Sequence, residues 1–142
     1  MHATRVISLD LDDTLWPIAP VIAAAESETH HWLTRHHPRM VERHSIERMR
    51  ELREQVALEH AERRHDLTFI RVAALRRQAR EAGCDESIAE QAFAVLFAAR
   101  NRVEPYQDCL PALELLSRRY RLFALSNGNA DLRLCGVDRF FS

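Results

Sequence analysis

The chain has 142 residues, a formal net charge of −1 and 46% hydrophobic residues. That length predicts one domain, or one domain with an insertion, and the composition argues against disorder. The balanced charge argues against nucleic acid or an acidic membrane surface as a partner. No apolar run approaches the roughly 20 residues that a bilayer requires, and the N-terminus lacks the apolar core of a signal peptide, so we expect a cytoplasmic protein.

Several residue types are absent or scarce. All 20 basic residues are arginine, which excludes a P-loop and Schiff-base chemistry within this chain. The 3 glycines are too few and too dispersed for a dinucleotide-binding GxGxxG loop. The 3 cysteines are widely spaced and form no CxxC pair, which argues against a disulfide framework or a zinc knuckle.

The first two thirds of the chain predict one strand followed by four helices. Residues 5–11 form a short apolar run with two β-branched residues, typical of a buried strand in a parallel sheet. Amphipathic helices are then expected over 20–37, from Ser45, from an N-cap at Asp66 to a C-terminal Gly83, and after Asp85. The expected inward positions of the middle two helices are Ile46, Met49, Leu52, Val56 and Leu58, and then Leu67, Ile70, Ala74 and Leu75.

The pattern changes after Val103. Asp108 is expected to cap a helix that carries Leu110, Leu113, Leu115 and Leu116, and residues 120–125 predict a second strand. The order strand, helical insertion, helix, strand predicts an α/β fold. In this interpretation residues 1–16 and 104–142 form a partial Rossmann-like parallel sheet, and residues 17–103 form an inserted four-helix bundle.

Acidic residues directly follow the first strand. Ligands of open α/β sheets bind beyond the carboxyl ends of the strands, and side chains two positions apart in extended chain point to the same side. The carboxylates of Asp10 and Asp12 would repel each other unless a cation lay between them, and oxygen ligands of this kind suit Mg²⁺. One carboxylate can attack phosphorus while the other transfers protons.

The segment DLDDTL after an apolar strand resembles the first motif, DxDxT, of haloacid-dehalogenase-type phosphatases. The resemblance implies that Asp10 is the nucleophile and a Mg²⁺ ligand. It implies that Asp12 is the general acid and base and offers its main-chain carbonyl to Mg²⁺. The family's second motif, a Ser or Thr that binds the transferring phosphate, is matched by Ser126. Asn127 and Thr14 complete the phosphate-binding residues that we expect.

The helical insertion resembles the type-one cap of this superfamily, a lid that contacts substrate and excludes water. A closer resemblance, to flavin mononucleotide phosphatases, is carried by DLDDTLW, by Pro20–Ile22, by HDLT at 65–68 and by SNGNA at 126–130. It makes flavin mononucleotide the first candidate substrate. It makes His65, Asp66 and Arg71 candidate substrate contacts in the cap, although helix capping and surface pairing explain the same residues.

The chain departs from the family after Ser126. The family's third motif is a lysine and its fourth an acidic pair, whereas only the separate acids Asp131 and Asp138 follow here. We therefore expect a C-terminally truncated phosphatase with impaired turnover. We also expect the free edge of the first strand to be covered by a second copy in a homodimer. A dehalogenase is disfavoured because Asp12 is present. The alternative function is that of a non-catalytic remnant acting as a helical interaction module.

A metal site built from histidines is a further interpretation. The chain has 8 histidines, several of them in the segment 30–44. They alternate with Glu, Thr and Arg on an amphipathic helix, which favours a solvated helix face over ligation.

Overall fold

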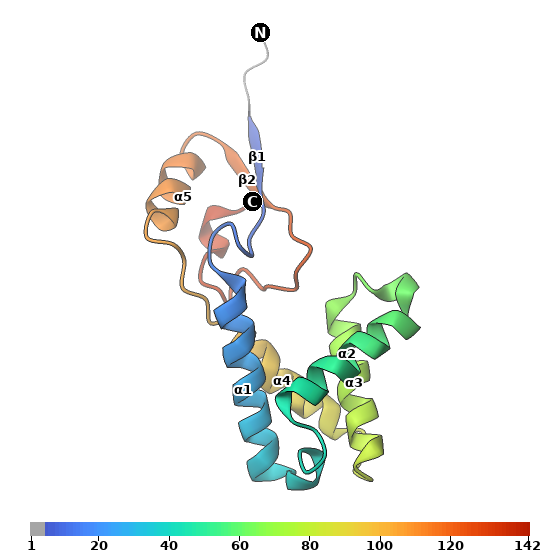
Figure 1. Cartoon of the computed structure of the whole chain (residues 1–142). Coiled ribbons are helices and arrows are strands. Elements are labelled where there is room, and N and C mark those ends of the chain that lie inside the picture. Colours follow the sequence, from blue (N-terminus) through green and yellow to red (C-terminus); the bar gives the residue numbers. More distant parts are fainter. Residues whose placement is uncertain (1–4) are drawn as a thin grey trace. The chain divides into compact units, whose positions relative to one another are not determined.

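The computed structural model describes residues 5–142, and the chain forms two compact units (Figure 1). The sheet unit comprises the chain up to Ile22 and Arg100–Ser142, and the helical unit comprises Ala23–Ala99. The fold is mixed α/β, mostly helical, with a small parallel sheet of two strands. The elements in chain order are β1 (Val6–Leu9), α1 (Ile18–His36), α2 (Ile46–Glu59), α3 (Leu67–Glu81), α4 (Ile88–Arg100), α5 (Cys109–Ser117) and β2 (Arg121–Ala124). None of the described helices is both long and apolar enough to cross a membrane.

The sheet unit is built on the pairing of β1 with β2. The two strands run parallel, with Val6 opposite Arg121 and Leu9 opposite Ala124, as the two apolar runs predicted. The pairing continues one step further, because the Leu125 N–H donates to the Leu9 carbonyl at 2.9 Å. Both strands therefore end at the same edge, and the polar residues that follow them begin there.

The prediction that the first strand is buried is wrong. Its residues are exposed or half-buried, and Val6 is 50% exposed. The described sheet has only two strands, so β1 has a strand neighbour on one side. The packed core of this unit lies instead among residues that follow or face the strands. The buried members are Leu11, Leu15, Trp16, Leu113, Leu122, Val137 and Phe140.

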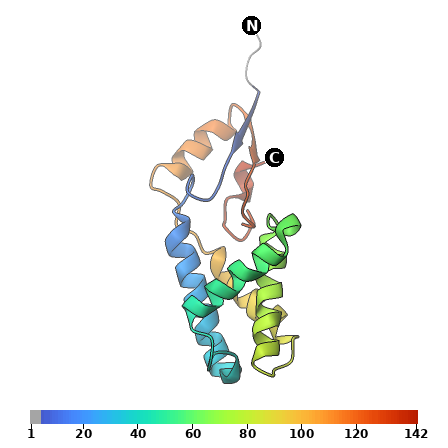
Figure 2. The same ribbon diagram turned by 45° about the vertical axis from the view of Figure 1, so that its right-hand side comes forward.

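The helical unit contains the predicted helix starts and the predicted stop. The Ser45 hydroxyl accepts from the Arg48 N–H at 3.2 Å and caps α2, and an Asp66 carboxylate oxygen accepts from the Phe69 N–H at 2.9 Å and caps α3. Gly83 follows α3 with φ +65°, a conformation that favours glycine. Helices α2 and α3 lie side by side in both views (Figures 1 and 2). Their apolar stripes meet through Leu52, Val56, Ile70, Ala74 and Leu75, all buried.

Two predicted inward leucines, Leu58 and Leu67, are on the surface, 71% and 39% exposed. Leu110 and Leu115 of α5 are exposed as well. Leu58 lies two residues after the buried Val56, and a two-residue step turns a helix by about 200°, so the two side chains point to opposite faces. Asp108 stands at the N-cap position of α5, as predicted, but its side chain makes no capping hydrogen bond.

Candidate active site at the ends of the two strands

The chain makes a tight turn after β1. The Leu15 N–H donates to the Leu11 carbonyl at 2.8 Å, and the Asp13 N–H donates to the Trp16 carbonyl at 2.8 Å. Asp13 has φ +60°, a left-handed conformation that aspartate tolerates better than most residues. Its carboxylate then accepts from the Ile18 N–H at 2.9 Å, where α1 begins. The sequence DLDDTLW thus folds into a closed turn that joins the strand to the helix.

Both carboxylate oxygens of Asp12 have partners. Oδ1 accepts from the Trp16 indole Nε1 at 2.8 Å, and Oδ2 accepts from Arg100 Nη2 at 2.5 Å. Trp16 is fully buried, so its indole cannot turn away without breaking the core. A charge-assisted bond on one oxygen and an indole bond on the other hold this carboxylate in one orientation.

Arg100 belongs to this candidate site and was not identified in the sequence analysis. It ends α4, is only 2% exposed, and its Nε donates to Asn129 Oδ1 at 3.0 Å. Its Nη1 is buried and has no hydrogen-bond partner among the described residues. The only signal in the sequence was an arginine that directly follows a mostly apolar stretch of α4, and 88 positions separate it from Asp12.

The loop after β2 packs against this pair. The Gly128 N–H donates to the Ser126 hydroxyl at 3.0 Å. A Cβ placed on Gly128 would overlap Asp12 Oδ2 and would lie 3.1 Å from Arg100 Nη2 and 3.3 Å from Ser126 Oγ. A side chain at this position would therefore displace the Asp12 carboxylate. The Asp12 carboxylate and the Ser126 hydroxyl both lie close to Gly128.

The other predicted residues of the strand ends are open to solvent. Asp10 directly follows β1, beside the Leu125 N–H that bonds to Leu9, and is exposed. Thr14 and Asn127 are exposed as well. The exposed Asp10 carboxylate is accessible to a ligand, whereas the neighbouring half-buried Asp12 carboxylate is held in place by its hydrogen bonds.

The predicted cap residues lie in the helical unit. His65 is exposed. Asp66 is occupied by helix capping, and its pKa is lowered by the Phe69 N–H and by Arg63, whose Nη2 donates to it at 3.0 Å. Arg71 lies 3.9 Å from a carboxylate oxygen of Glu26 in a pocket between helices. Helix capping therefore explains why an aspartate stands at position 66. Arg71 lies among the charged side chains around Glu26.

The residues at the strand ends supply oxygen ligands. The Asp10 carboxylate and the Asp12 main-chain carbonyl are hard donors of the kind that Mg²⁺ prefers, and Mg²⁺ usually keeps several waters. Within residues 5–142, no group of three or more His, Cys, Asp or Glu side chains is placed to hold a metal ion, the histidines included. The donors fit Mg²⁺ in kind, and they would provide part of its coordination.

The fold and the site define an α/β protein with acids after one parallel strand and a serine after its neighbour, at the edge where such sheets bind ligands. A family model described as haloacid dehalogenase-like hydrolase matches residues 4–142, and the chain belongs to this family. The superfamily that the DxDxT motif predicted is thus confirmed.

Similar proteins support the same grouping. The chain is 31% identical, over 95% of its length, to 5-amino-6-(5-phospho-D-ribitylamino)uracil phosphatase YigB of Escherichia coli K12. A 2-haloacid dehalogenase from Pseudomonas syringae superposes with a TM-score of 0.89 at 30% identity over 99% of the chain. The HAD-hydrolase YfnB of Bacillus subtilis, solved bound to magnesium, superposes over 99% of the chain with a TM-score of 0.59 at 17% identity and shares the fold. The chain spans 58% of the length of YigB and 62% of each of the two solved chains.

Proposed function

We propose that this HAD-like hydrolase is a Mg²⁺-dependent phosphomonoesterase that acts through an aspartyl-phosphate on a small phosphorylated metabolite. The observation that carries the proposal is the placement of the Asp12 carboxylate and the Ser126 hydroxyl against Gly128, with Asp10 at the adjoining strand end. The phosphatase activity named for the Escherichia coli relative supports it. In this proposal residues 1–16 and 104–142 belong to a Rossmann-like core, and residues 17–103 form its helical cap.

The two acids have different roles in the proposed reaction. The Asp10 carboxylate attacks phosphorus and forms the new P–O bond while the ester oxygen departs. In its protonated form Asp12 donates a proton to that leaving oxygen, and the resulting carboxylate takes a proton from the water that hydrolyses the aspartyl-phosphate. Ser126, Asn127 and Thr14 hold the phosphate oxygens. Bound to the Asp10 carboxylate and the Asp12 carbonyl, Mg²⁺ would neutralise charge on the phosphoryl group.

Trp16 and Arg100 support the acid and base. A residue that transfers protons must stay within hydrogen-bond reach of the reacting oxygen, and its orientation depends on the groups that hold it. The bonds of 2.8 Å from Trp16 and 2.5 Å from Arg100 supply that orientation for Asp12.

Two candidate substrates share one chemical part. Flavin mononucleotide is the candidate that the sequence resemblance indicates, and the name of the Escherichia coli relative contains a 5-phospho-D-ribitylamino group. Both molecules carry a ribityl 5-phosphate attached to a nitrogen. We therefore place a phosphorylated ribityl compound first among the substrate classes to assay.

The test is hydrolysis of flavin mononucleotide, of 5-amino-6-(5-phospho-D-ribitylamino)uracil and of p-nitrophenyl phosphate, with Mg²⁺ or with EDTA. We expect weak, Mg²⁺-dependent turnover that Asp10→Asn reduces by at least about a thousandfold, as loss of a nucleophile does in other enzymes. Asp13→Asn is the matched control, because the amide oxygen can still accept from the Ile18 N–H. Equal rates for Asp10→Asn and the unchanged chain would refute the nucleophile. A folded chain with no turnover favours the non-catalytic interaction module.

The homodimer remains a prediction. The free edge of β1 and the exposed Val6 are the features that a second copy would cover. Light scattering of the purified chain tests it, and a monodisperse monomer would contradict it.

A further inference from the structure

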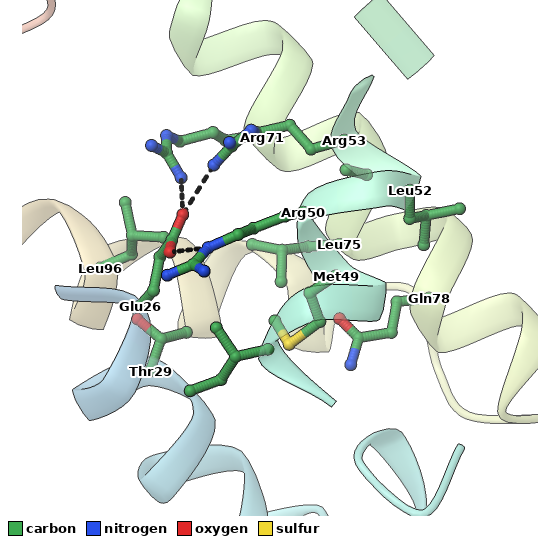
Figure 3. Close-up of a pocket in the computed structure, with 12 residues that line it drawn as sticks. Glu26, Thr29, Met49, Arg50, Leu52, Arg53, Arg71, Leu75, Gln78 and Leu96 are labelled. Carbon is green, nitrogen blue, oxygen red and sulfur yellow. Dashed lines mark hydrogen bonds and ion pairs between the residues drawn. The ribbon is translucent and has the colours of Figure 1, made fainter. Parts of the chain in front are cut away.

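A small pocket lies between the helices of the helical unit, which supplies all the residues that line it (Figure 3). The pocket provides about 40 Å³ of space, room for a few water-sized groups. Its walls are mainly apolar and include Met49, Leu75 and Leu96. The polar side chains in the wall already have partners: the Thr29 hydroxyl donates to Ala25 at 2.7 Å, and the Gln78 amide donates to Met40 at 2.6 Å. The interior therefore suits a small apolar group.

Three arginines lie around one carboxylate on one side of this pocket. Glu26, on α1, is 8% exposed, and one of its oxygens accepts from Arg50 Nε at 2.7 Å while the other accepts from Arg53 Nη1 at 2.8 Å. Arg71, on α3, lies 3.9 Å from the second oxygen. Figure 3 shows the three guanidinium groups gathered around the single carboxylate. Glu47, on the surface beside Arg50, is a second and more distant negative charge.

Another ion-pair cluster that joins α2 to α3 has more carboxylates than guanidinium groups. Arg77 Nη1 donates to both carboxylate oxygens of Glu59 at 2.8 and 2.9 Å, and its Nε lies 3.5 Å from Glu81. There one guanidinium meets two carboxylates. In the Glu26 cluster, three guanidinium groups from α2 and α3 lie around one carboxylate of α1.

Guanidinium groups with a shared carboxylate still have donors to offer. Each guanidinium has five N–H donors in a fixed planar fork, which matches the geometry of carboxylates and phosphates. Glu26 engages one nitrogen of Arg50 and one of Arg53. The side chains of Arg50 and Arg53 are 44% and 28% exposed, so a ligand can reach them from solvent.

We infer that this pocket binds the oxyanion of a small ligand, a phosphonate, phosphate or carboxylate group, whose short apolar stem enters the space between the helices. The arginines neutralise the anion, and the apolar walls take the stem. Glu26 competes with the ligand for the same guanidinium donors and keeps the three cations together when no ligand is bound. The site lies within the helical unit and does not depend on the proposed phosphatase activity.

The test is isothermal titration calorimetry of the purified chain in EDTA, which measures the affinity for propylphosphonate and for inorganic phosphate. Propylphosphonate has no ester bond, so it cannot be hydrolysed as a phosphate ester. We expect it to bind several-fold more tightly than inorganic phosphate for each carbon that becomes buried. Arg53→Gln should weaken binding at least tenfold, the effect of losing one charge-assisted hydrogen bond. If circular dichroism shows that Arg53→Gln does not fold, Arg50→Gln is measured in its place.

Three control variants distinguish this site from the phosphoryl centre and from a general loss of positive charge. Arg77→Gln, which removes a charge from the same pair of helices, should leave the affinity unchanged. Ser126→Ala removes a hydroxyl that the proposed function assigns to phosphate binding, so propylphosphonate binding that persists in this variant belongs to the pocket of the helical unit. Glu26→Gln should tighten binding, because the competing carboxylate is gone. Absence of binding at millimolar propylphosphonate, equal affinities in Arg53→Gln and the unchanged chain, or loss of binding in Ser126→Ala would each overturn the inference.

Discussion

Two carboxylates largely withdrawn from solvent, one in each unit, are held in opposite ways. In the sheet unit, Asp12 faces one guanidinium and one indole N–H, so the charges balance and each oxygen has one strong bond. In the helical unit, Glu26 faces three guanidiniums. The single pair orients the acid, whereas Arg50 and Arg53 beside Glu26 keep N–H donors that reach solvent. The carboxylate of Asp12 is thus held in one orientation by its partners, whereas the carboxylate of Glu26 holds several arginine side chains together.

The burial of the partners sharpens this difference. Arg100 has only 2% of its surface exposed, and it also bonds to Asn129. A buried charge is costly unless it is paired and hydrogen-bonded, so Arg100 depends on Asp12. Beside Glu26, Arg50 and Arg53 reach solvent and remain hydrated without the carboxylate. Removal of one partner should therefore have unequal consequences in the two units.

The largest effect is expected from Arg100→Gln. It leaves the Asp12 carboxylate without its cation, and breaking a buried ion pair from one side typically costs about 3–5 kcal/mol. Urea unfolding followed by circular dichroism and tryptophan fluorescence measures the change. Arg118→Gln, which removes an exposed pair with Glu114 in the same unit, is the control and should change little. A loss no larger than that of the control would show that the Asp12 pair is not structurally important.

Gly128→Ala should have the next largest effect. The added Cβ overlaps the Asp12 carboxylate, and overpacking of this kind costs about 1–3 kcal/mol. It should also displace the carboxylate and change the fluorescence of Trp16, which bonds to it. Gly136→Ala is the control in the same unit, because its Cβ would meet nothing within 4 Å although φ is +74°. Equal fluorescence spectra for the two variants would contradict the crowding at Gly128.

Helix caps provide a smaller contrast between the units. Ser45→Ala removes a hydroxyl that caps α2 and should cost about 1 kcal/mol in thermal or urea unfolding. Asp108→Ala in the sheet unit should cost little, because that side chain makes no capping bond to α5. The opposite order would mean that Asp108 caps its helix in solution.

The smallest effect is a pH dependence in the helical unit. The His44 ring, whose Nε2 lies 2.9 Å from Glu81, holds the pKa of Glu81 below its ordinary value of 4.5. A lowered pKa in the folded state adds stability above the unfolded value, and that stability is lost as the pH falls through the folded value. Glu81→Gln should therefore lose stability near neutral pH and show a shallower decline below about pH 4.5 in urea titrations. If the stability of Glu81→Gln and that of the unchanged chain fell in parallel as the pH is lowered, this role of His44 would be contradicted.

Local sequence signals predicted the elements well. Short apolar runs marked both strands, and Ser45, Asp66 and Gly83 marked helix ends, because caps and left-handed glycines act on their immediate neighbours. The DxDxT motif identified the family for the same reason, since its acids lie within one turn of chain. Periodicity was weaker at helix ends, where it placed Leu58 and Leu67 inside although both are exposed.

Only the tertiary structure decided which distant groups meet. Local sequence determined the strands, the helices and the acids at the first strand's end, because those depend on contacts between near neighbours. No local pattern could pair Arg100 with Asp12 or bring Arg50, Arg53 and Arg71 to Glu26. Those contacts join residues 24 to 88 positions apart, once the helices have folded back on one another. Burial then selects which charges must be paired and which can remain in water.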